Sequence, residues 1–219
     1  MPAFTCTVCG AAFEVAEAAL AKYPGWSPKY CREHSPKKKP PAAVSANTAK
    51  KSGRSSVTLE RDLSLEEVLT SFSEGPDTGL FTDGSSRPNP GPGGWGVVKV
   101  KEGVVIEQRY GHAADTTNNR MELTALIEAF SLTSPDEALN IYTDSELCVN
   151  TITKWAAAWE QNGWKRKSGP IQNLELVKKL YELAQARPKV QLTWIEAHNG
   201  WRWNEYADSL STAWAREKL

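Results

Sequence analysis

The sequence predicts an α/β fold, in which helices pack on a mixed sheet, preceded by a small N-terminal module. Three observations support this. Between residues 79 and 219, short apolar runs bounded by turn residues alternate with longer segments of helical periodicity. The first strands are joined through Glu102-Gly103, a hairpin signal, whereas later strands are separated by helices. Three of the four cysteines lie within the first 31 residues, which sets that part apart.

The large segment is expected to begin with a strand at 79–83, an apolar run that ends in a turn. Strands at 95–100 and 104–110 form the hairpin. The stretch 118–132 has apolar residues three and four apart and predicts a helix. The remaining expected elements are strands at 139–143 and 190–195 and helices at 145–154, 155–162, 171–186 and 203–218.

Composition divides the chain into residues 1–35 with the cysteine cluster, a linker at 36–78, and the α/β domain at 79–219. The linker is rich in Lys, Pro, Ala and Ser, and then turns acidic. Between Lys37 and Arg54 it carries six basic residues and no acid. A short amphipathic helix is expected near Ser64, where Glu67 completes a capping box.

The chain has 219 residues, of which 40% are hydrophobic, as in ordinary globular proteins. No apolar run approaches the ~18 residues of a transmembrane helix, and the N-terminus lacks the pattern of a secretory leader. We therefore expect a cytoplasmic protein without a membrane partner. Nothing indicates an oligomer, so a monomer is expected.

Four acidic residues are candidate ligands for a hard divalent cation. Asp83 and Asp144 end two expected strands, and Glu122 lies early in the first long helix, where strand ends and helix starts gather sites. Asp208 lies in the last helix, ten residues after His198. Taken singly, an Asp after a strand is more often a turn or helix cap. Gathered carboxylates instead favour Mg²⁺ or Mn²⁺.

The residues around these acids form four motifs that resemble the type 1 ribonuclease H family, in order over roughly residues 79–217. The motifs are Phe81-Thr82-Asp83-Gly84-Ser85 with Asn89-Pro90-Gly91-Pro92-Gly93-Gly94-Trp95-Gly96, Thr116-Thr117-Asn118-Asn119-Arg120-Met121-Glu122-Leu123, Tyr142-Thr143-Asp144-Ser145, and His198-Asn199-Gly200 with Asn204-Glu205 and Ala207-Asp208. The resemblance implies the ribonuclease H-like fold, a five-stranded mixed sheet with three antiparallel and then two parallel strands.

The resemblance also implies an activity, which is endonucleolytic hydrolysis of the RNA strand of RNA–DNA hybrids, leaving 5′-phosphate and 3′-hydroxyl ends. Asp83, Glu122, Asp144 and Asp208 would bind two Mg²⁺ ions, with Mn²⁺ as an alternative metal. His198, on a loop before the last helix, would assist proton transfer or product release.

Substrate contacts are implied in the same way. Asn118 and Asn119 match positions near the RNA 2′-hydroxyls, and Asn89, Thr117 and Asn118 match positions near the phosphates. A second group matches the family's basic protrusion, which grips the DNA strand: Trp155, Trp159, Trp164, Lys165, Arg166 and Lys167. Trp155 and Trp159, four residues apart, fit a hydrophobic core equally well.

Two departures from the family pattern add negative charge. Glu196-Ala197 precedes His198, which favours a stiffer loop and disfavours nearby phosphate. Glu146 follows Asp144-Ser145, where it either repels RNA or faces solvent. The protrusion helix carries three alanines and Glu160, so its grip is expected to be weaker.

The N-terminal cysteines predict a structural zinc site. Cys6 and Cys9 form C-x₂-C, and after a 21-residue spacer Cys31 and His34 form C-x₂-H, which together supply four tetrahedral ligands. A unit this small needs such a metal for its folding energy. The alternative is a disordered tail with incidental cysteines. Cys148 is expected to be a small buried residue.

Two other functions stay open from sequence. One is a non-catalytic protein that binds hybrids or other nucleic acids, which the full ligand set disfavours. The other is a DNA-cutting nuclease of the same fold, which the motif around Glu122 disfavours.

Overall fold

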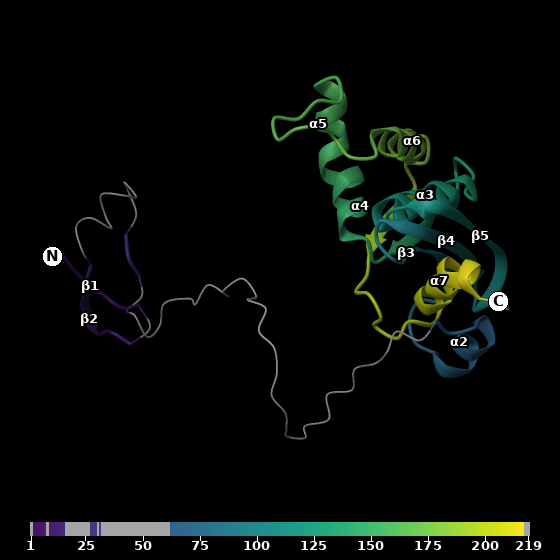
Figure 1. Cartoon of the computed structure of the whole chain (residues 1–219), viewed down its shortest axis with the longest axis horizontal. Coiled ribbons are helices and arrows are strands. Elements are labelled where there is room, and N and C mark those ends of the chain that lie inside the picture. Colours follow the sequence, from purple (N-terminus) through teal and green to yellow (C-terminus); the bar gives the residue numbers. More distant parts are fainter. Residues whose placement is uncertain (1, 8, 16–26, 30, 32–61, 217–219) are drawn as a thin grey trace. The chain divides into compact units, whose positions relative to one another are not determined.

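The computed structural model describes all residues except 1, 8, 16–26, 30, 32–61 and 217–219 (Figure 1). The chain divides into two units, Met1–Ser56 and Val57–Leu219, which are treated separately. The basic run of the linker and His34 lie outside the described residues. In the first unit, β1 (Ala3–Thr5) and β2 (Ala12–Glu14) pair antiparallel and bring the rings of Phe4 and Phe13 to 6.1 Å.

The second unit is built on a five-stranded mixed sheet. Its strands are β3 (Gly79–Ser86), β4 (Gly91–Lys101), β5 (Val104–Thr116), β6 (Leu139–Thr143) and β7 (Val190–Trp194). The order is β5-β4-β3-β6-β7. The first three pair antiparallel, and β6 and β7 join in parallel. This confirms the predicted sheet.

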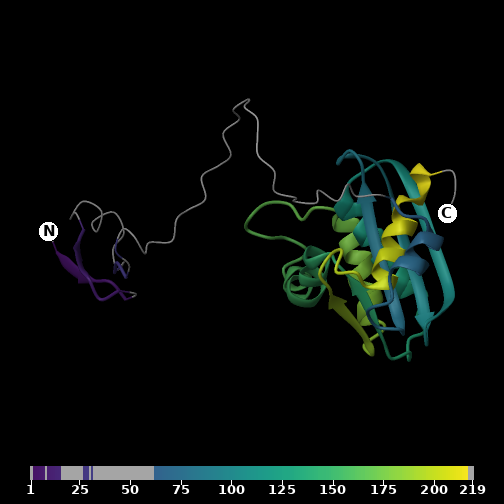
Figure 2. The ribbon, with the colours of Figure 1, turned by 90° about the horizontal axis from the view of Figure 1, so that it is seen from below.

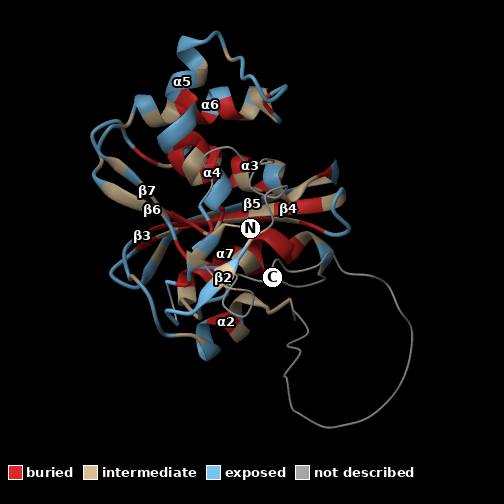
Figure 3. Ribbon diagram, turned by 90° about the vertical axis from the view of Figure 1, so that its left-hand side faces the viewer, coloured by how far each residue is buried: buried red, intermediate tan, exposed pale blue. Residues whose placement is uncertain are grey.

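Helices cover both faces of the sheet (Figure 3). On one face lie α3 (Asn118–Ser131), α4 (Glu146–Asn150), the π-helical turn η1 (Thr151–Trp155), α5 (Ala156–Gln161) and α6 (Leu174–Gln185). On the other lie α2 (Leu65–Ser71), α7 (Arg202–Thr212) and the 3₁₀ turn η2 (Ala213–Ala215). Figure 2 shows α7 crossing the strands beside α2.

The two faces have separate apolar cores because side chains alternate along β3. Leu80 belongs to the cluster under α3 and α6, with Leu126, Phe130 and Leu180. Phe81 points the other way and belongs to a cluster with residues of α2 and α7, among them Val68, Tyr206 and Leu210. The strand that carries Asp83 is therefore held from both sides.

Several element ends differ from the sequence prediction. The turn expected at Asp83 is wrong, because β3 continues to Ser86, paired with Gly93 at the start of β4. The last helix ends at Thr212 rather than near residue 218. Helix α6 begins at Leu174, three residues after the expected start.

Helix α2 confirms the capping box. The Ser64 side chain accepts from the Glu67 backbone N–H, and the Glu67 carboxylate accepts from the Ser64 backbone N–H at 2.9 Å. Val68 is fully buried. The last part of the stretch assigned to the linker thus packs into the second unit.

Candidate active site

Asp83 lies where two glycines let helices approach β3 from opposite faces. Gly96 is its partner on β4, and a Cβ there would lie 2.5 Å from the Ala207 carbonyl oxygen, so α7 rests directly on the β4 backbone. A Cβ on Gly84 would lie 2.2 Å from the Glu122 backbone nitrogen, so α3 touches the backbone beside Asp83. These contacts bring Glu122 and Asp208 to Asp83.

Asp144 reaches the same place through the sheet. β6 is the parallel neighbour of β3, with Thr82 opposite Thr143. Asp83 and Asp144 each follow these residues, so they emerge at the same end of adjacent strands. Four carboxylates from β3, α3, β6 and α7 therefore gather at one end of the sheet.

The pKa values of all four carboxyl groups are raised at this end of the sheet. Burial, then the negative charge of Asp83, raises the pKa of Asp144 and of Asp208 to about 7. Burial likewise raises the pKa of Glu122, and Asp83 adds to it. Burial raises the pKa of Asp83 itself, although a Ser211 hydrogen bond opposes the rise. A divalent cation would relieve this repulsion, so the oxygen donor set fits Mg²⁺ or Mn²⁺.

Two serine hydroxyls hold the carboxylates. Ser211 on α7 donates to Asp83, and Ser145 donates to Glu122. The sequence prediction did not single out Ser211. Its signal was the spacing, since a residue three positions after Asp208 lies on the same helical face. The Cys148 thiol, 2% exposed as predicted, lies 3.8 Å from a Glu122 oxygen.

His198 lies beside the carboxylates on an exposed loop. Its backbone is left-handed, with φ of 50°, and its side chain is 55% exposed. The His198 Nδ1 atom is 3.7 Å from a Glu205 carboxylate oxygen. The positive charge of the His198 imidazole acts to lower the pKa of Asp83, Asp144 and Asp208. Glu146 and Glu196, the two extra acids, are exposed.

The predicted RNA-contact amides meet at the start of α3. Thr117 caps the helix and accepts from the Arg120 backbone N–H at 3.4 Å. Asn118 Oδ1 accepts from the Ser86 backbone N–H at 2.7 Å, and the Asn118 backbone N–H donates to Asn89 at 3.3 Å. Asn89, Thr117 and Asn118 thus form one polar surface at the end of β3.

The protrusion residues divide into two groups. Asn119, Trp155, Trp159 and Arg166 line one cavity of about 240 Å³, with the Arg166 guanidinium 5.9 Å from the Trp159 ring centre. Trp164 instead packs edge-on against Tyr181 on α6, with the Lys178 ammonium 5.4 Å from its ring. Lys165 and Lys167 are exposed.

Trp155 and Trp159 differ in burial. Trp155 is 39% exposed, whereas Trp159 and Trp164 pack against the core cluster under α3. Trp164 packs against Tyr181 and the core, and the lining of the cavity beside Asn119 does not include it.

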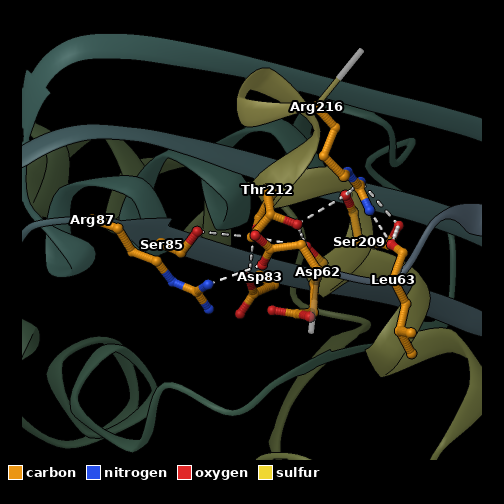
Figure 4. A network of polar contacts seen from close by, with 10 residues as sticks. Asp62, Leu63, Asp83, Ser85, Arg87, Ser209, Thr212 and Arg216 are labelled. Carbon is orange, nitrogen blue, oxygen red and sulfur yellow. Dashed lines mark hydrogen bonds and ion pairs between the residues drawn. The ribbon is translucent and has the colours of Figure 1, made fainter. Parts of the chain in front are cut away.

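Arg87 is a cation near the carboxylates that the sequence prediction missed. Its guanidinium donates to Asp62 at 2.9 Å, and its charge lowers the pKa of Asp83 and Asp208 (Figure 4). It follows Asp83 by four residues, beyond the expected end of the strand.

The N-terminal unit gathers three predicted zinc ligands. The potential ligand atoms of Cys6, Cys9 and Cys31 lie within 4.8 Å of one another. They form the one such group of three or more acidic, cysteine or histidine ligands in the described part of the chain. The active-site carboxylates are thus spread more widely in this structure.

Within the described ranges, no helix is both long and apolar enough to cross a membrane.

The fold and the site together define a class of protein: an α/β domain whose mixed five-stranded sheet presents a cluster of four carboxylates at one end. Comparison with known proteins agrees. The family described as RNase H matches residues 76–216. The chain belongs to the RNase H family, which uses a divalent metal, Mg²⁺.

Relatives in this family are similar over most of their length. Ribonuclease H of Mycolicibacterium gilvum (strain PYR-GCK) is 44% identical over 141 residues, covering 64% of this chain and 93% of the relative. Ribonuclease H of Agrobacterium fabrum (strain C58 / ATCC 33970) is 48% identical over 134 residues, covering 60% of this chain and 90% of the relative. Among solved structures, LC9-RNase H1, a type 1 RNase H with the type 2 active-site motif, matches with a TM-score of 0.50 and 31% identity, covering 64% of this chain and 74% of that chain.

Proposed function

We propose that this chain is an endonuclease that hydrolyses the RNA strand of RNA–DNA hybrids with two Mg²⁺ ions, leaving 5′-phosphate and 3′-hydroxyl ends. The observation that carries the proposal is the meeting of four carboxylates from four separate parts of the fold, where burial raises the pKa of all four and the charge of Asp83 adds to the rise in the other three. Membership of the RNase H family supports the reaction class.

The chain's own residues have separate tasks in this proposal. Asp83, Glu122, Asp144 and Asp208 hold the ions, with Mn²⁺ as an alternative. When bound, the ions supply Lewis acidity that activates water and offsets charge on the leaving oxygen. His198, exposed and near three of the carboxylates, exchanges a proton at its imidazole nitrogens or assists product release.

The substrate strands contact different surfaces. Asn118 and Asn119 bind near the RNA 2′-hydroxyls, because an amide can donate to and accept from that group. Asn89 and Thr117, together with Asn118, lie near the phosphates. The DNA strand lies over the protrusion, where Trp155 offers an exposed ring and Trp159 and Arg166 line the same cavity. Lys165 and Lys167 add positive charge, and Trp164 packs this element against the core.

A cleavage assay tests the function. Labelled RNA–DNA hybrid, double-stranded RNA and double-stranded DNA are incubated with the protein in Mg²⁺, Mn²⁺ or EDTA. We expect cutting of the RNA in the hybrid alone, with either metal and not in EDTA. Uncut hybrid that still binds the protein would indicate a non-catalytic binding protein, and cut DNA would indicate a DNA nuclease.

We also propose that Cys6, Cys9, Cys31 and His34 bind one structural zinc ion. Tetrahedral zinc with Zn–S bonds of about 2.3 Å holds its sulfurs about 3.8 Å apart. The Cys9 and Cys31 sulfurs are 3.9 Å apart. The Thr7 backbone N–H and hydroxyl both donate to the Lys29 carbonyl, which ties the first cysteine pair to the chain before Cys31.

Metal analysis of the full chain tests the zinc site. We expect one zinc per chain, and its loss in Cys31→Ser. Asp83→Asn is the matched control, because it alters the other metal site and should retain the zinc. Absence of stoichiometric zinc from the unaltered protein would end the proposal.

A further inference from the structure

We infer that residues 62–75 form a brace that positions helix α7, and with it Asp208 and Ser211, for metal binding. The inference rests on the proposed role of Asp208 as a metal ligand. The match to the RNase H family begins at residue 76, so the brace lies outside it.

The middle of the brace packs on α7. Val68 of α2 has no exposed surface and lies in one apolar cluster with Tyr206, Ala207 and Leu210. Tyr206 and Ala207 directly precede Asp208. Any shift of α2 therefore changes the packing of the turn that carries this carboxylate, because cores transmit small displacements.

The start of the brace is tied to the end of α7 (Figure 4). The Ser209 hydroxyl donates to the Leu63 carbonyl at 2.6 Å. The Arg216 guanidinium donates to the same carbonyl and to the Ser209 carbonyl. The Leu63 carbonyl oxygen of the brace thus accepts hydrogen bonds from two side chains, those of Ser209 and Arg216.

The other end of the brace is tied to the start of α7. Arg202 Nε donates to the Phe72 carbonyl at 2.6 Å, and the Arg202 backbone N–H donates to the Glu74 carbonyl at 2.9 Å. A Cβ on Gly75 would lie 2.7 Å from the Trp201 ring, so the chain passes directly against it. Asp208 lies between Arg202 and Ser209, and Ser211 lies between Ser209 and Arg216, so anchor residues stand on both sides of each.

The brace also reaches the end of β3. Asp62 accepts from Arg87 at 2.9 Å, and Arg87 directly follows Ser86, the last residue of the strand whose Asp83 accepts from Ser211. The same segment therefore touches both elements whose relative position sets the distance between Asp83 and Asp208.

Two variants of the full chain test the brace. Val68→Ala loosens its packing, and Ser209→Ala removes a hydroxyl to Leu63. Leu180→Ala is the control, since Leu180 is equally buried in the core on the opposite face. The first readout is the Mg²⁺ dissociation constant, obtained from the Mg²⁺-induced rise in Tm. The second is the Mg²⁺ concentration that gives half-maximal hybrid cleavage, with each variant assayed at the same interval below its own Tm.

We expect both brace variants to raise the Mg²⁺ dissociation constant at least fivefold, with cleavage recovering at saturating Mg²⁺, and the control to leave it within twofold. An unchanged constant in both brace variants, or an equal change in Leu180→Ala, would overturn the inference. If the unaltered protein does not cut hybrid, the proposed function fails, yet the Mg²⁺-induced rise in Tm still decides the brace.

Discussion

Ser211 of α7 donates a hydrogen bond to the carboxylate of Asp83 on β3, and so links the last helix of the domain to the first strand of its sheet. Its hydroxyl also lies 3.2 Å from that of Ser85 and 3.0 Å from the Asp208 carbonyl. One small side chain therefore orients a proposed metal ligand and touches the helix that carries another.

Replacing Ser211 by Ala should weaken Mg²⁺ activation of hybrid cleavage about tenfold, because residues that orient metal ligands contribute on that scale. The Mg²⁺ concentration for half-maximal activity measures this. Ser131→Ala is the matched control, since its hydroxyl donates to the Ile127 carbonyl at 2.8 Å on another helix. Equal activation constants for Ser211→Ala and the unaltered protein would show that the hydroxyl is incidental.

In EDTA, the protein should become more stable as the pH falls from 8 to about 5. The pKa values of Asp144 and Asp208 are about 7 in the folded chain, against an ordinary 3.8. Between these values the folded state binds more protons than the unfolded state, so the free energy of unfolding rises as pH falls and is lost as pH rises through 7.

Tm measured against pH in EDTA checks this, and excess Mg²⁺ should raise Tm most at the alkaline end. The double variant Asp144→Asn with Asp208→Asn should show a flatter profile. A Tm in EDTA that is flat or falls as the pH is lowered from 8 to 6 would contradict the raised pKa values of Asp144 and Asp208.

Trp155 and Trp164 should respond differently to replacement by Ala. Trp155 is the more exposed, so its loss should weaken hybrid binding by about 1–3 kcal/mol, the range for a stacking ring, with a small change in Tm. Trp164 is partly buried against Tyr181 and the core, so its loss should cost about 3 kcal/mol of stability, the low end of the range for Trp→Ala. Binding titrations and thermal unfolding separate the two, and a reversed pattern would refute the assignment.

Much of the fold was predictable because its signals are local. The strand at 139–143 and the α3 helix followed from apolar runs and periodicity, and the capping box at Ser64 from two residues three apart. The four carboxylates were identified only through the residues around them, since an isolated Asp after a strand is usually a cap.

What escaped prediction depends on contacts distant in sequence. Gly84 to Ser86 resembled a turn, yet they extend β3 because Gly93 to Trp95 pair with them. Leu63 resembled part of a linker because nothing local shows that Ser209, 146 residues later, donates to its carbonyl. Ser211 lacked a motif of its own, and packing between elements distant in sequence, such as that of α7 on Gly96, brings it to Asp83.

The central claim is that Asp83 and its neighbouring carboxylates hold the cations that cut RNA in a hybrid. The most direct measurement is the rate of hybrid cleavage by Asp83→Asn in saturating Mg²⁺, with Tm measured to verify folding. We predict that the rate falls on the order of 10³-fold. The variant loses several kcal/mol of transition-state stabilisation from the metal ions, and about 1.4 kcal/mol corresponds to a tenfold change in rate. A folded Asp83→Asn protein that cuts the hybrid at a rate near that of the unaltered chain would contradict the claim.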